Sequence, residues 1–161
     1  MTLAGAVCLT PRAWAASAQV KSEANQSPAQ PAPVALRGRV VCLTEEYQRL
    51  YQAVPDCDKR GHVYGLKTAD GQLYAFLPTD MAAAISDDQR FRERELLVTA
   101  RQFPASSFVE VIKLQSIRDG KRYDLFYFCE VCNIQSHKPG PCDCCQDPVI
   151  FHEEPAEPAR N

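Results

Sequence analysis

The chain has 161 residues, and its 18 Lys and Arg against 20 Asp and Glu give a formal net charge of −2. This length accommodates one ordinary domain, or a small domain with an appendage, and the acidic balance disfavours a polyphosphate partner. Eight cysteines are many for a chain of this size, and five of them fall between positions 129 and 145, which points to metal ligation or disulfides.

Residues 1–15 resemble the end of an export signal. Ala13 and Ala15 give the small-x-small pattern that signal peptidase reads after a short apolar run. No basic residue precedes Arg12, so we interpret this segment as a signal peptide remnant; the alternative is an Ala-rich disordered tail. We expect an exported protein of the periplasm or cell envelope that begins near Ala16. The run is too short to span a bilayer, and we expect no transmembrane segment in the mature chain.

Composition divides the rest of the chain into four parts. Residues 16–35 are polar, Pro-rich and Ala-rich without an aromatic, and residues 153–161 are acidic with two prolines, so we expect both to be disordered. Residues 36–128 carry alternating apolar patterns typical of strands, and residues 129–152 contain the cysteine cluster. We therefore predict a β domain followed by a small metal module.

The β domain is predicted to hold five strands before the segment that leads to the cysteines. Asp70-Gly71 and Asp119-Gly120 are typical two-residue hairpin turns. Thr79 is a suitable cap for a short helix from residue 80 to about 85, and residues 45–53 favour a helical turn or loop. The predicted strands cover residues 36–44, 62–69, 72–77, 95–103 and 108–118, and residues 121–128 return from the last turn.

Five strands with a helix between the third and the fourth are the pattern of an OB-fold-like barrel. Within these strands we predict that the apolar core includes the mostly buried residues Val40, Val41, Leu66, Leu73, Leu77, Leu97, Val109 and Ile112.

The barrel segment also resembles a group of small bacterial exported proteins with OB-like domains. Their first strand has a Gly-x-Val-Val pattern, a Cys-containing loop follows, and a Gly-Leu-x-Thr-x-Asp-Gly hairpin precedes a Val-Thr-Gly-like strand. The matching residues here are Gly38, Val40, Val41, Cys57, Gly65, Leu66, Thr68, Asp70, Gly71, Val98 and Thr99. The resemblance covers residues 36–118, departs at Ala100 where Gly is expected, and implies fold far more than function.

Two Cys-x2-Cys pairs separated by nine residues form the motif CEVCNIQSHKPGPCDCC. Each pair can form a tight turn that directs two sulfurs to one ion, about 2.3 Å from a tetrahedral zinc, and Pro and Gly before the second pair favour a turn. We predict a zinc-ribbon-like module with a structural zinc ion. Its ligands are Cys129, Cys132, Cys142 and Cys145.

This segment resembles a short heavy-metal-binding module of exported and membrane copper-handling proteins. The residues at the places of that module's pattern are Tyr127, Cys129, Cys132, Pro139, Gly140, Cys142 and Cys145. Cys132 stands where that module has His, Gln146 where it has Gly, and Asp147 where it has Met. The chain thus lacks the thioether ligand suited to Cu(I), and four thiolates favour zinc.

Other cysteine chemistry stays open at this stage. In an oxidising compartment the same four cysteines can form two disulfides instead. Cys144 is interpreted as a spare thiol or a competing ligand, and His137 and His152 as solvated loop residues rather than ligands. Asn133 and Gln146 follow the two pairs where covalent haem attachment needs His.

Cys42 and Cys57, fifteen residues apart, are predicted to form a disulfide in an exported protein. The alternatives are a buried Cys42 with a free Cys57, or a second metal site that includes His62.

No Walker loop, dinucleotide fingerprint or nucleophile elbow occurs, so we expect no enzyme. The favoured function is a non-catalytic, monomeric exported module that carries structural zinc and binds a protein or metal partner in the envelope. One alternative is a single-stranded nucleic-acid binder, using Tyr64, Tyr74 and Phe76 beside Arg37, Arg39 and Lys67. A second alternative is a thiol-based metal carrier.

Overall fold

The computed structural model of the chain describes residues 30–54, 56–57 and 61–157. The predicted signal peptide, most of the predicted linker and residues 158–161 lie outside these ranges. None of the helices within the described ranges is both long enough and apolar enough to cross a membrane.

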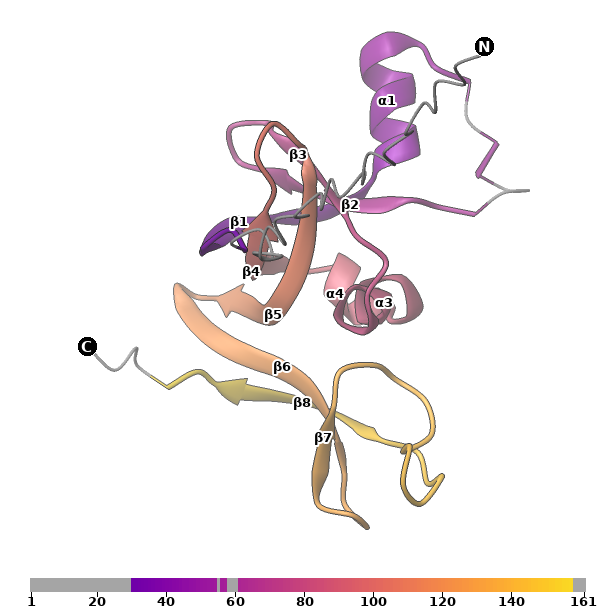
Figure 1. Cartoon of the computed structure of the whole chain (residues 1–161), viewed down its shortest axis with the longest axis vertical. Coiled ribbons are helices and arrows are strands. Elements are labelled where there is room, and N and C mark those ends of the chain that lie inside the picture. The colour runs from indigo at the N-terminus through magenta and orange to yellow at the C-terminus, as the bar shows by residue number, and fades with distance from the viewer. Residues whose placement is uncertain (1–29, 55, 58–60, 158–161) are drawn as a thin grey trace, which may run out of the picture.

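The described chain is mainly β, with long strands and short helices (Figure 1). The helices are α1 (Leu43–Tyr51), α3 (Asp80–Asp87) and α4 (Gln89–Arg92). The strands are β1 (Pro33–Cys42), β2 (Tyr64–Thr68), β3 (Leu73–Phe76), β4 (Glu95–Gln102), β5 (Phe108–Arg118), β6 (Lys121–Cys129), β7 (Ile134–Ser136) and β8 (Ile150–Pro155).

Five strands close into a ring. β1 pairs with β2 on one edge and with β4 on the other, β2 continues to β3, and β4 continues to β5, all antiparallel. A short parallel pairing of β3 with β5 closes the ring, where Ala75 pairs with Phe108 and Phe76 with Val109. The helices α3 and α4 lie between β3 and β4 in the chain and contribute Ala84, Ile85 and Phe91 to the core.

Two glycines allow the strands of the ring to approach closely. A Cβ atom at Gly38 would lie 2.3 Å from the carbonyl oxygen of Lys67, and one at Gly65 would lie 2.3 Å from that of Tyr74. Both obstacles are backbone atoms that cannot turn aside, so a larger residue would push neighbouring strands apart. Gly38 and Gly65, which belong to the pattern shared with the small exported OB-like proteins, therefore allow close packing of neighbouring strands in this chain.

The core is centred on alternate residues of β4, where Leu96, Val98 and Ala100 are fully buried. The predicted core residues Val40, Leu66 and Val109 are buried as expected. The prediction was wrong for Leu97, which is only half-buried because it pairs with Arg37 and Gln115 on the outer face of the sheet.

Four other predicted core residues, Val41, Leu73, Leu77 and Ile112, are also half-buried. Ile112 is displaced by a β-bulge: Thr99 pairs with Lys113 and Ala100 with Val111, so Ile112 has no partner across the strands. The extra residue reverses the alternation of β5, and the buried side chains are Val111 and Leu114.

The structure confirms the predicted cap of α3 and one of the two predicted hairpin turns. Thr79 accepts a hydrogen bond from the backbone N–H of Ala82 and caps α3 as predicted. Asp119 and Gly120 both have positive φ and turn β5 into β6. The turn between β2 and β3 differs from the two-residue prediction, because residues 69–72 separate the strands and only Gly71 there has positive φ.

Candidate metal centre

Strand β6 leaves the ring and forms the base of the C-terminal module (Figure 1). Its first half pairs with β5 and its last three residues pair with β7, while β8 runs along the opposite edge from Tyr123 to Phe128. The last residue of β6 is Cys129, which is 1% exposed. The strand that supports the module is thus anchored in the ring.

The two cysteine pairs adopt the same local geometry. In the first, the N–H of Asn133 donates to the carbonyl of Cys129 at 2.8 Å; in the second, the N–H of Gln146 donates to the carbonyl of Cys142 at 2.9 Å. Asn133 and Gln146 both have positive φ, 56° and 67°. The N–H of Cys132 also points at the sulfur of Cys129, at 3.4 Å. Each pair is a tight turn that ends in a left-handed residue and brings its sulfurs to one side.

The second pair lies at the tip of a narrow loop. The N–H of Cys142 donates to the carbonyl of Asp147 at 2.7 Å, and the N–H of Val149 donates to the carbonyl of Gly140 at 3.0 Å. Pro141 and Pro148 face each other across the loop as an isolated bridge. The chain then enters β8, so backbone bonds hold Cys142 and Cys145 above the end of β6.

The four predicted cysteine sulfurs converge, and all lie within 4.8 Å of one another. The sulfurs of Cys129 and Cys145 are 3.4 Å apart. The edge of a tetrahedron with zinc–sulfur arms of about 2.3 Å is roughly 3.8 Å long, so this spacing is close to that of a four-thiolate site. All four are free cysteines in the structure, and Cys129 and Cys142 are buried. The donor set fits a tetrahedral, thiophilic ion.

Backbone groups prepare one sulfur for ionisation. The N–H groups of Cys145 and Cys144 point at the sulfur of Cys142 and lower the pKa of that thiol to about 7, against the cost of its burial. The pKa of the Cys132 thiol is raised, first by its contact with Cys144 and then by Cys145. A cation among the sulfurs would favour the thiolate form of all of them.

Cys144 is exposed and lies outside the converging group, in keeping with a spare thiol. Its contact with Cys132 makes it the nearest competing ligand. His137 is exposed, whereas His152 is on β8, half-buried and stacked on Phe126. The interpretation of His152 as a solvated loop residue was therefore wrong, and neither histidine belongs to the converging group.

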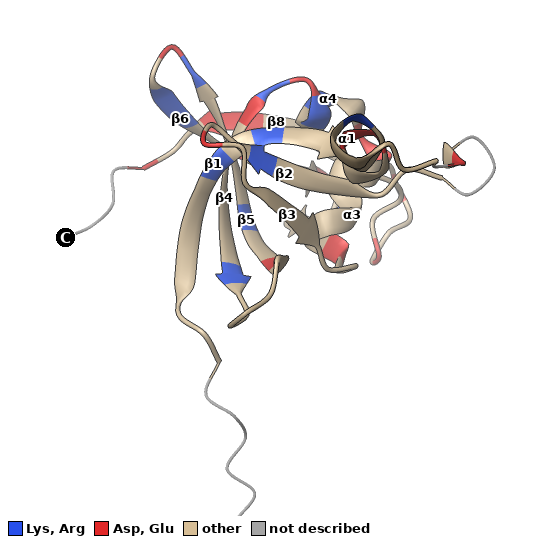
Figure 2. Ribbon diagram, turned by 90° about the horizontal axis from the view of Figure 1, so that it is seen from above, with Lys and Arg blue, Asp and Glu red and all other residues tan. Residues whose placement is uncertain are grey.

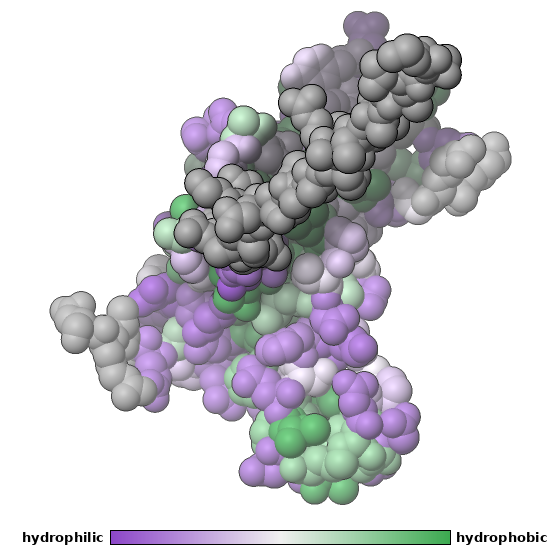
Figure 3. All heavy atoms as spheres, viewed as in Figure 1, coloured by the Kyte–Doolittle hydropathy of each residue, from purple (hydrophilic) through white to green (hydrophobic). Residues whose placement is uncertain are grey.

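The module has little apolar interior of its own. Its two largest aliphatic residues between the cysteines, Val131 and Ile134, are 68% and 42% exposed, and Figure 3 shows apolar spheres over this outer end of the molecule. Burial of these side chains therefore contributes little to the order of the two turns. A cross-link through the sulfurs would add to the backbone hydrogen bonds that hold them.

A buried cluster joins the module to the ring. The hydroxyl of Tyr127 donates to Asp88 Oδ2 at 2.6 Å, and Asp88 also caps α4 through the N–H of Arg90 at 2.9 Å. The rings of Phe91 and Phe151 pack against Tyr127, with centroids 6.3 and 5.6 Å away. Hydrogen bonds from Arg90 and Tyr127 outweigh the desolvation of Asp88 and hold its pKa at about 2. Sequence reasoning missed this cluster, since its members are far apart in the chain.

Cys42 and Cys57, the predicted disulfide pair, are both free thiols in the structure. Their sulfurs contact the same hydroxyl, that of Thr44, at 2.8 and 3.1 Å. The two sulfurs are therefore close to each other, and a disulfide between them stays a prediction beside the alternative of a metal site. Glu45 and His62 lie beside them; a Cys-x2-Glu pattern at the start of a helix was the available signal for Glu45.

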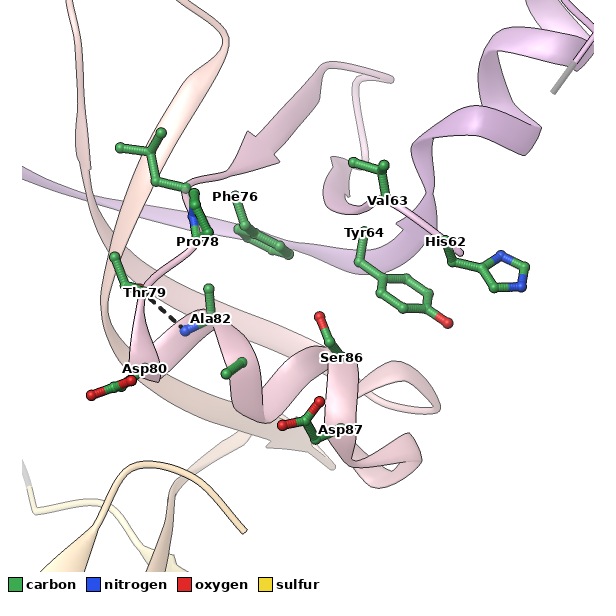
Figure 4. A pocket seen from close by; sticks show the side chains of 12 residues that line it. His62, Val63, Tyr64, Phe76, Pro78, Thr79, Asp80, Ala82, Ser86 and Asp87 are labelled. Atoms are coloured by element: carbon green, nitrogen blue, oxygen red, sulfur yellow. Dashed lines mark hydrogen bonds between the residues drawn. The ribbon is translucent and has the colours of Figure 1, made fainter. Parts of the chain in front are cut away.

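The aromatic residues of the nucleic-acid alternative pack against the core and are half-buried. Tyr64 and Phe76 line a pocket of about 680 Å³ between α3 and the β2–β3 side of the ring (Figure 4). Asp80 and Asp87 are its charged lining residues, apart from His62 at the rim. Tyr74 is not part of this lining.

Comparisons of the chain with protein-family models, with curated proteins and with solved structures find no match.

Proposed function

We propose that this chain is a non-catalytic, exported metal-binding protein in which Cys129, Cys132, Cys142 and Cys145 hold a structural zinc ion. The observation that carries the proposal is the convergence of four sulfurs from two matching turns, two of them buried. Four protein ligands complete a tetrahedron and leave no position for water or substrate, so such a site stabilises structure and does not catalyse.

We further propose that the ring is an OB-fold barrel. Its strand order, β1-β2-β3-β5-β4 and back to β1, and a helix between the third and fourth strands support this assignment. Its place in the function is that of a scaffold, because β6 extends from it to carry the metal module.

The nucleic-acid alternative requires basic side chains that are free to meet phosphates. Arg37 instead forms a bidentate pair with Glu95, at 2.8 and 2.9 Å, and Lys67 pairs with Glu46 at 2.9 Å. Figure 2 shows Lys and Arg interspersed with Asp and Glu around the ends of the strands, not gathered on one face. This distribution favours the metal-binding proposal.

A thiol-based carrier needs sulfurs that a donor or acceptor protein can reach. Cys129 and Cys142 are 1% and 2% exposed, which favours a retained, structural ion at this site. A site closed by four protein ligands has no position for a substrate, so we propose that the protein acts by binding. We propose a monomer whose partner is a protein or a metal ion of the cell envelope. The export assignment depends on Ala13 and Ala15, outside the described residues.

Metal content of matched variants tests the structural-zinc proposal. Cys142→Ser removes a buried member of the group, whereas Cys144→Ser, two residues away, removes an exposed thiol outside it. Under reducing conditions we expect Cys142→Ser to lose one equivalent of zinc and Cys144→Ser to keep it. Equal loss in both variants, or full retention in Cys142→Ser, would overturn the ligand assignment.

Protein purified from its native host tests the compartment. N-terminal sequencing should begin near Ala16, and fractionation should place the protein in the envelope. Material that starts at Met1 in the cytoplasm would contradict the export proposal and leave the metal proposal standing.

A further inference from the structure

A second group of side chains that can ligate a metal ion lies at the beginning of α1, apart from the four cysteines of the C-terminal module. Cys42 ends β1 and is the residue before the first turn of α1, and Glu45 lies within that turn. Cys57 and His62 precede β2 in the chain. The N–H of Leu43 donates to the carbonyl of Val63 at 2.8 Å, so the two segments are held together beside these four side chains.

The donor atoms already have the spacing of a coordination shell. All four lie within 4.8 Å of one another. His62 Nδ1 is 3.3 Å from Cys42 Sγ and 3.4 Å from Glu45 Oε1. A tetrahedral ion with arms of about 2.0–2.3 Å separates its ligands by roughly 3.3–3.8 Å, which matches these two distances.

We propose that Cys42, Glu45, Cys57 and His62 form a second zinc site. Two thiolates, an imidazole and a carboxylate are all common zinc ligands, and a tetrahedral ion can take one atom from each. Two soft sulfurs disfavour the hard cations Mg²⁺ and Ca²⁺, which prefer oxygen. The same ion would neutralise most of the charge that two thiolates and a carboxylate bring together.

The second site differs from the cysteine module in its access to solvent. Cys42 is buried at its base, but the side chains of His62 and Glu45 are 41% and 61% exposed. Thr44 supports the inner side, with its hydroxyl against both sulfurs. The ion here is accessible to chelators and partners, so it exchanges faster than the ion held by the buried Cys129 and Cys142. This accessible site is the one suited to metal transfer.

The proposal is independent of the structural-zinc site, and stoichiometry separates the two. Reduced, metal-free full-length protein is titrated with Co²⁺ and then with Zn²⁺, with Co²⁺ absorption reporting thiolate ligation. We expect two equivalents for the wild type, one for Cys57→Ala, one for Cys142→Ser and two for Cys144→Ala. The metal retained by Cys57→Ala should show the stronger thiolate-to-cobalt absorption of a four-sulfur site.

Two exposed ligands give variants that do not disturb the core. His62→Gln and Glu45→Gln should each weaken the more exchangeable equivalent, His62→Gln by at least about 10-fold, and leave the other unchanged. In the wild type, the His62 imidazole NMR signals should shift on addition of the second equivalent of Zn²⁺.

Two equivalents in both Cys57→Ala and His62→Gln, or one equivalent in the wild type that only Cys142→Ser removes, would overturn the second site. A Cys42–Cys57 disulfide without the second metal, in protein from the native host, would also overturn it. Loss of the only equivalent in Cys57→Ala, with none lost in Cys142→Ser, would instead support this site and contradict the structural zinc.

Discussion

Tyr127→Phe tests how the ring and the module are joined. The substitution removes one hydroxyl from a side chain that is 1% exposed and leaves its ring contacts with Phe91 and Phe151 in place. The lost bond is the one to Asp88 Oδ2, at 2.6 Å. Hydrogen bonds to charged groups contribute about 1.5–3 kcal/mol. Because Asp88 keeps Arg90 as a partner, we expect a loss near the middle of that range, about 2 kcal/mol.

The pH dependence of this loss identifies the charged partner. The pKa of Asp88 is about 2 in the folded protein, against about 3.9 when unfolded. A lowered pKa means that ionised Asp88 stabilises the fold above pH of about 3.9, and that this stability disappears as the pH falls toward 2. The difference between wild type and Tyr127→Phe should therefore be constant above pH of about 4 and shrink below it.

Urea unfolding of both proteins, under reducing conditions from pH 7 downward, measures this difference. At low pH protons compete with zinc for the thiolates, so both proteins lose the ion. Neither Tyr127 nor Asp88 is a proposed ligand, so the comparison between the two proteins is unaffected. Tyr47→Phe, at a residue 47% exposed, is the control and should change little. A negligible loss at pH 7, or a loss that is as large at pH 2–3, would refute the reasoning.

Four other substitutions test local features of the structure. Gln146→Gly should stabilise the zinc-loaded protein by up to about 1 kcal/mol, measured by thermal unfolding, because Gln146 has a φ of 67°; a lower melting temperature would contradict this. Leu96→Ala should cost about 2–5 kcal/mol in urea unfolding, and Leu97→Ala clearly less, because Leu96 is fully buried and Leu97 is not; equal costs would contradict the register. Gly38→Ala should lower the melting temperature sharply through its clash with the Lys67 carbonyl, and an unchanged value would show that β1 and β2 can separate.

The sequence predicted β1 to β6, the short helix after Thr79 and the converging cysteines, because local patterns specify these features. It missed β7 and β8, and residues 153–155, which were predicted to be disordered, belong to β8. Alternation locates a strand, but it does not select which of two apolar neighbours faces inward. Leu96 and Leu97 are both apolar, and only the pairing of Leu97 with Arg37 places it outside. The bulge at Ile112 depends on how β5 meets β4, which the spacing of apolar residues in one strand does not reveal.

The candidate sites also combine features that local sequence predicts with contacts that depend on the tertiary fold. The two Cys-x2-Cys pairs are local, so their spacing was sufficient to predict the converging group. Glu45 meets Cys57 and His62 in the folded chain, where the Leu43 N–H also donates to the Val63 carbonyl. Asp88 and Tyr127 meet across 39 positions of the chain. Contacts of this kind depend on the tertiary fold, and a single sequence carries no direct signal for them.

Zinc-edge X-ray absorption tests most directly whether four sulfurs hold one zinc ion at the end of β6. The sample is Cys57→Ala protein loaded with one equivalent of zinc under reducing conditions, since this variant lacks one ligand of the second site. We predict four sulfur neighbours at about 2.3 Å and no nitrogen or oxygen neighbour. A nitrogen or oxygen atom in the first coordination shell, or fewer than four sulfurs, would contradict the account.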